Sequence, residues 1–118
     1  MNKNLDFQTG QILFLQCGQE RLYTELIQIV KERQLCWVRP LLLADFDIEP
    51  PLITDLRSSS DLLWSINLFQ PALDVEVISF FSEIFAKESQ LNLEITAKQR
   101  LHIFIQRLWN QQTDSPSS

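Results

Sequence analysis

The central segment of the chain, residues 21–44, has the sequence RLYTELIQIVKERQLCWVRPLLLA. It consists of two apolar runs, 21–30 and Leu35–Ala44, joined by the polar residues Lys31–Gln34. The first run carries apolar residues at helical spacing, but β-branched and aromatic side chains, which favour strands, also crowd it. A polar connection of this length is typical of a hairpin. We therefore predict a β-hairpin here and keep a helix over 21–30 as the alternative.

The second run of this hairpin presents different side chains on its two faces. Because side chains alternate along a strand, Trp37 and Arg39 share one face, whereas Cys36 and Val38 share the other. Pro40 has no amide hydrogen to donate to a sheet ladder. We therefore expect Pro40 at a sheet edge or at a β-bulge.

The flanking segments predict further short strands. Residues 11–16, Leu52–Arg57 and Leu62–Ser65 are rich in apolar residues and are bounded by turn-forming residues. Asp45–Pro51 combines acidic residues with two prolines, which predicts a loop. Short antiparallel hairpins in series form a meander or a small barrel.

The last third of the chain changes to a helical period. A helix is expected to start at Pro71, and its apolar stripe consists of Leu73, Val77, Phe81, Ile84 and Phe85. A second helix is expected to begin at Thr96, because Thr96 and Gln99 stand at the spacing of a capping box. Its predicted buried stripe consists of Leu101, Phe104, Ile105 and Leu108.

Together these patterns predict an α+β fold. We expect a small antiparallel β-sheet or partly open barrel of about four to five strands, packed against two C-terminal helices. Residues 1–110 should form a single domain. The polar residues 111–118 have no apolar anchor, and we expect them to be a disordered tail.

The composition excludes several classes of protein. The 118 residues include ten Lys and Arg against fifteen Asp and Glu, for a net charge of −5. Nucleic-acid binding and polybasic membrane binding both need clustered cations, so neither is expected. No apolar run approaches the roughly 20 residues of a membrane span, and the first ten residues lack a secretory apolar core. We therefore expect a cytoplasmic protein without membrane insertion, with its two cysteines reduced.

The residues that carry chemistry are few. One histidine and two cysteines are too few for a structural zinc site. The acidic residues Asp45, Asp47 and Glu49 alternate as at the start of a calcium loop, but the glycine and glutamate required further on are absent. A small enzyme that pairs His102 with Cys17 or Cys36 stays open as an alternative. Nothing in the sequence activates such a pair, so we predict no enzyme, no cofactor and no metal.

Aromatic and arginine residues indicate a different role. Trp and Arg are enriched at the energetic centres of protein interfaces, and Trp37 and Arg39 share one predicted strand face. A strand edge next to Pro40 could receive an extended peptide. Residues 45–95 contain ten acidic and two basic residues. Such an acidic surface would attract a basic partner, but solubility alone would explain the same composition. We predict Trp37, Arg39, Phe46 and Trp64 as partner-binding residues, with packing in the core as the alternative for each.

Two segments carry a resemblance to a known family. These are RQLCWVRP at 33–40 and DLRSSSDLLWSINLFQPALDVEVISFFSEI at 55–84. With them the chain resembles a family of small soluble cyanobacterial proteins, the CcmS-like carboxysome assembly factors. The resemblance implies an adaptor that recognises the C-terminal tail of a hexameric carboxysome shell protein, and it assigns no functional residue. An accessory subunit or assembly chaperone of a photosynthetic complex is the alternative.

Overall fold

The hairpin predicted for residues 21–44 forms the centre of the sheet. The computed structural model describes residues 7–86 and 93–113. In it, β2 (Glu20–Val30) and β3 (Leu35–Asp45) pair antiparallel along their whole length. The helix considered for 21–30 is therefore wrong. The polar connection forms one turn of 3-10 helix, Lys31–Arg33, and ends at Gln34 in the left-handed region with φ of 57°.

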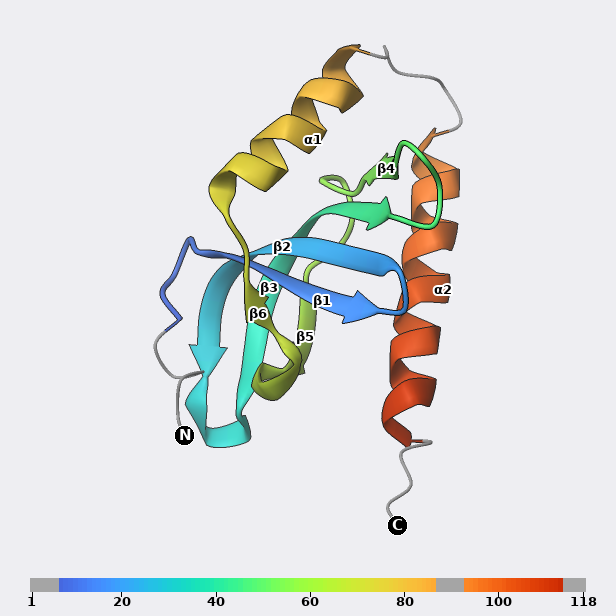
Figure 1. The fold of residues 1–118 in the computed structure, drawn as a ribbon. Coiled ribbons are helices and arrows are strands. Elements are labelled where there is room, and N and C mark those ends of the chain that lie inside the picture. The colour runs from blue at the N-terminus through green and yellow to red at the C-terminus, as the bar shows by residue number, and fades with distance from the viewer. Residues whose placement is uncertain (1–6, 87–92, 114–118) are drawn as a thin grey trace.

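Four further strands complete an antiparallel sheet, and two helices pack on it (Figure 1). The sheet order is β4–β3–β2–β1–β6, and β5 also pairs with β3. The α+β prediction is thus confirmed, with six strands instead of four or five. The remaining elements are β1 (Ile12–Cys17), β4 (Leu52–Asp55), β5 (Leu62–Ser65), β6 (Gln70–Pro71), α1 (Asp74–Ala86) and α2 (Leu93–Thr113).

Pro40 lies at a β-bulge, one of the two positions predicted for it. Tyr23 pairs with Leu42 and Thr24 pairs with Pro40, so Leu41 is the extra residue of β3. Pro40 does not mark the edge of the sheet, because β3 lies between β2 and the strands β4 and β5. Because of the extra residue, the side chains after the bulge point to the opposite face of the sheet from the one that regular alternation would give them. As a result, Val38 and Leu42 belong to different apolar clusters on the two sides of the sheet.

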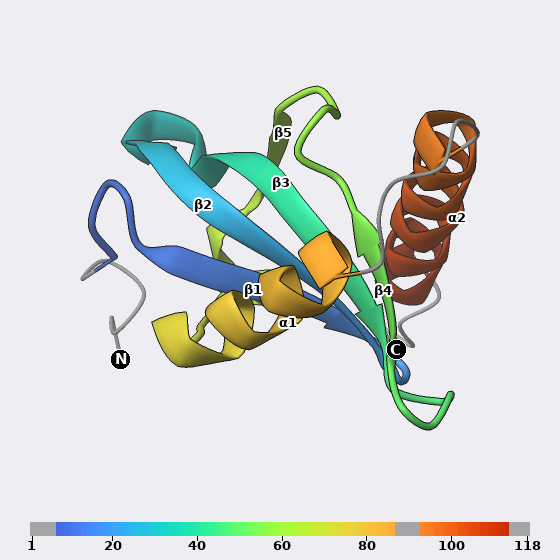
Figure 2. The same cartoon turned by 90° about the horizontal axis from the view of Figure 1, so that it is seen from above.

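The two helices cover opposite faces of the sheet, as Figure 2 shows from above. Alternation along β1 illustrates the arrangement: Leu13 and Leu15 pack in the cluster that contains Phe104 of α2, whereas Phe14 packs in the cluster that contains Val77 of α1. Burial on both faces of the central strands explains why β1 and β2 are rich in apolar residues without a regular polar face.

The ends of the helices differ from the prediction. α1 begins at Asp74, because Pro71 belongs to β6 and pairs with Leu13. α2 begins at Leu93, so Thr96 lies inside the helix and the predicted capping box at its start is wrong. The predicted stripe of α2 does face the sheet, with Phe104 and Leu108 buried.

α2 also continues past the predicted domain end at Asn110, to Thr113. Glutamine is a good helix former, and Gln111 and Gln112 extend the last turn where the prediction had a tail. The rest of that predicted tail, 114–118, lies outside the described residues, as do the side chains of Ile84 and Phe85. No helix in the described ranges is long and apolar enough to cross a membrane.

Candidate functional site

Trp37 is a large aromatic side chain that the sheet presents to solvent in a fixed orientation. It projects from β3 between the buried residues Cys36 and Val38, and 38% of it is exposed. Its indole Nε1–H donates a hydrogen bond to Asp61 Oδ2 at 2.9 Å. Leu63 of β5 lies directly opposite Trp37 in the sheet and is 54% exposed. Since directly paired residues share a face, Trp37 and Leu63 form a continuous apolar area.

Arg39 adds a positively charged side chain next to this apolar area. It lies two residues after Trp37 on the same face of β3, and it pairs with Glu25 of β2. The Arg39 Nη1 atom is 3.7 Å from Glu25 Oε1, and both side chains are exposed. Such an exposed pair contributes little to stability, so Arg39 can exchange Glu25 for another anionic partner at little cost. We name Trp37, Arg39 and Leu63 the Trp37 surface.

The Trp37 surface lies on the sheet face that α1 covers in part. Glu25, the partner of Arg39, is two residues from Tyr23, and Tyr23 packs in the cluster that contains Val77 of α1. Tyr23 also hydrogen-bonds Glu76 of α1 at 3.4 Å. Helix α1 therefore covers the half of the face near Tyr23 and leaves the half at Trp37 uncovered.

Phe46, a predicted partner-binding residue, belongs to the covered half. Its ring lies at 6.1 Å from that of Phe80 of α1, edge to face. The guanidinium of Arg21 lies 5.6 Å from the Phe46 ring and 4.5 Å from the Phe14 ring. These contacts give Phe46 a packing role at the end of β3, the alternative considered for it.

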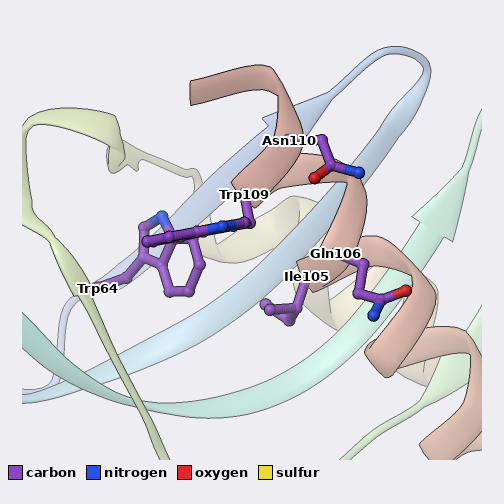
Figure 3. A pocket seen from close by; sticks show the side chains of 5 residues that line it. All are labelled: Trp64, Ile105, Gln106, Trp109 and Asn110. Atoms are coloured by element: carbon purple, nitrogen blue, oxygen red, sulfur yellow. The ribbon is translucent and has the colours of Figure 1, made fainter. Parts of the chain in front are cut away.

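Trp64, the fourth predicted residue, lies on the opposite face of the sheet. It pairs with Cys36, whose side chain points toward α2. The Trp64 ring meets Trp109 of α2 at 6.2 Å and 79°, and the two rings border a pocket of about 350 Å³ (Figure 3). Ile105, Gln106 and Asn110 of α2 complete the lining. The Trp64 Nε1–H is buried and has no hydrogen-bond partner among the described residues.

The four predicted residues therefore do not form one surface. The structure brings Trp37 and Arg39 together and places Phe46 and Trp64 elsewhere. Leu63, Asp61 and Trp109 were missed as candidates, although the alternation of β5 carries a signal for Leu63. The contact between Trp109 and Trp64 depends on how α2 crosses the sheet, which no local pattern encodes.

The residues of the alternative enzyme hypothesis lie in two different environments. Cys17 and Cys36 are free and buried in the core, and burial raises the pKa of both thiols, that of Cys36 to about 11. A thiol with a raised pKa is protonated at neutral pH and is a poor nucleophile. His102 is exposed on α2, whereas Phe104, two residues further along the helix, faces the core.

The predicted acidic loop does not assemble a cation site. Asp45 is half-buried, and its Oδ1 accepts a hydrogen bond from the amide of Asp47 at 3.0 Å, which makes a local turn. Among the residues whose side chains the structure describes, no three His, Cys, Asp or Glu side chains gather closely enough to hold a metal ion. The chain matches no protein-family model, no curated protein and no solved structure.

Proposed function

We propose that this chain is a non-catalytic adaptor or assembly factor that binds a partner protein on the Trp37 surface. One observation carries the proposal: Trp37 is exposed and yet held in place by Asp61, beside an exposed leucine. Tryptophan and arginine dominate the energy of protein interfaces when they are desolvated together. A side chain that is already held in place loses less rotamer entropy on binding, so the Asp61 hydrogen bond favours association.

The resemblance to carboxysome assembly factors supplies a first partner to test. It suggests the C-terminal tail of a carboxysome shell protein, met in the cytoplasm of a cyanobacterium. A tail is a short extended segment, and the Trp37 surface is flanked by strands rather than by a deep cleft, which suits such a ligand. An accessory subunit or chaperone of a photosynthetic complex would use the same surface with a larger partner.

Titration calorimetry with a synthetic shell-protein tail peptide tests the proposal. Truncation of an interface tryptophan costs about 2 kcal/mol or more, so Trp37→Ala should weaken binding by about 30-fold. Arg39→Ala should weaken it less. Ile103→Ala is the matched control, since Ile103 is an exposed apolar residue on the other side of the sheet. Equal affinity of the Trp37→Ala and Ile103→Ala variants would exclude the Trp37 surface, and no binding by the wild type would exclude this tail as partner.

A further inference from the structure

The strand β5 forms a margin of the sheet with backbone groups directed outward. It pairs with β3 on one side, and no other strand of the described chain pairs with it (Figure 2). The Ile66 amide donates to the Gln34 carbonyl at 3.0 Å, so Gln34 and Ile66 form a hydrogen-bonded pair next to the β3–β5 ladder. Hydrogen-bonded and non-hydrogen-bonded pairs alternate in an antiparallel ladder, so the pair of Trp37 with Leu63, three residues further on, is a non-hydrogen-bonded one. The amide and the carbonyl of Leu63 therefore point away from β3, toward the open margin.

The sequence of this margin does not protect it from pairing with another strand. Natural edge strands are often very short, carry lysine, proline or an inward-pointing charge, or are covered by a neighbouring element. The strand β5 is short, but its sequence, LLWS, has no charge and no proline. Its outward backbone groups can therefore pair with one added strand.

Both faces beside the margin have apolar surface for the side chains of an added strand. On one face, Leu63 lies beside the exposed Trp37. On the other face, the pocket between Trp64 and Trp109 opens, and each of the five residues that line it is uncharged. A strand beside β5 would send alternate side chains to these two places.

We infer that the margin of β5 binds an extended segment of a partner protein, which adds to the sheet as a seventh strand. The segment carries large apolar side chains at alternate positions, one set against Leu63 and Trp37 and the other, uncharged, in the Trp64–Trp109 pocket. The inference rests on the proposed function and names the class of partner that it requires. A second copy of the chain is a poorer occupant, because the four residues of β5 are too short for the roughly 800 Å² per partner of a stable dimer.

Selection of short random peptides displayed on phage against the wild-type protein tests this inference. We expect the selected peptides to share alternating large apolar residues, and we expect their binding to fall at least tenfold in Leu63→Pro. This variant removes the outward amide without removing a hydrogen bond to β3. Leu63→Ala is the matched control, because it keeps the amide and removes the side chain, and it should bind more tightly than Leu63→Pro. If no peptide is selected, or if folded Leu63→Pro binds as tightly as Leu63→Ala, the inference is wrong.

A second measurement covers the case in which Leu63→Pro does not fold. Methylation of single backbone nitrogens in a selected peptide keeps its side chains and removes one donor at a time. Strand addition predicts that methylation at alternate positions weakens binding at least tenfold, whereas equal binding of all methylated peptides overturns it. If Trp37→Ala alone weakens binding while Leu63→Pro and peptide methylation have no effect, the Trp37 surface binds the partner without strand addition. The proposed function then stands and the inference about β5 fails.

Discussion

Replacement of Phe104 by alanine tests the docking of α2 on the sheet. Phe104 is completely buried in the cluster that contains Leu13 and Leu15 of β1. Burial of this kind makes a Phe→Ala substitution cost about 3–5 kcal/mol, because transfer energy is lost and a cavity remains. Alanine is the best helix former, so the loss cannot come from α2 itself. With an unfolding entropy of about 2.1 cal/mol/K per residue, the 118 residues give about 250 cal/mol/K, so Tm should fall by about 12–20 °C.

Thermal unfolding followed by circular dichroism measures this change, and urea unfolding gives the free energy independently. Ile103→Ala is the matched control, because it is the adjacent residue of the same helix and is 50% exposed. Its expected effect is within about 1 kcal/mol. If the two variants lose the same stability, or if Ile103→Ala loses more, α2 does not pack on the sheet through the Phe104 face and the described core is wrong.

Three further predictions concern single side chains. Asp61→Ala should free the Trp37 ring and weaken tail-peptide binding about two- to tenfold in calorimetry, because ordering a side chain on binding costs roughly 0.5–1.5 kcal/mol. Asp61→Asn keeps an acceptor oxygen and should weaken binding less. Because burial raises the pKa of Cys36 to about 11, a thiol reagent should modify it slowly at neutral pH and quickly in denaturant; fast reaction in the native state would contradict its burial. Hydrogen bonds from Arg57 hold the pKa of Asp55 below its ordinary value in the folded protein. The ionised carboxylate therefore stabilises the fold at any pH above the pKa of Asp55 in the unfolded chain, and this contribution is lost as the pH falls through the pKa of Asp55 in the folded protein. The advantage of wild type over Asp55→Asn in urea unfolding should therefore shrink in acid, and a constant difference would refute the assignment.

The elements that local patterns specify were predictable. The hairpin follows from two strand-forming runs around Lys31–Gln34. The missing amide hydrogen of Pro40 predicted a sheet edge or a bulge, and the pairing of β2 with β3 decides for the bulge. The buried stripe of α2 follows from its 3.6-residue period. The start of α2 was not predictable, because Leu93–Ile95 are compatible with helix and no residue there enforces a stop before Thr96.

The arrangement of the site depends on long-range pairing, which explains the errors there. A series of hairpins predicts that β4 and β5 pair with each other, but both pair with the long strand β3. The register of β5 puts Leu63 opposite Trp37, and it puts Trp64 on the other face. A shift of one residue would exchange the two. The two-residue strand β6 is too short to have a recognisable period.

Photo-crosslinking in the native host tests most directly whether the Trp37 surface binds a partner. A photoreactive phenylalanine derivative replaces Gln28, the exposed residue of β2 that pairs with Trp37, in one protein and Ile103 in a second, and mass spectrometry identifies the crosslinked peptides. We predict one dominant partner from position 28, absent from position 103 and displaced by excess purified wild type but not by the Trp37→Ala variant. The same products from both positions, or none from position 28, would contradict a binding role for this surface.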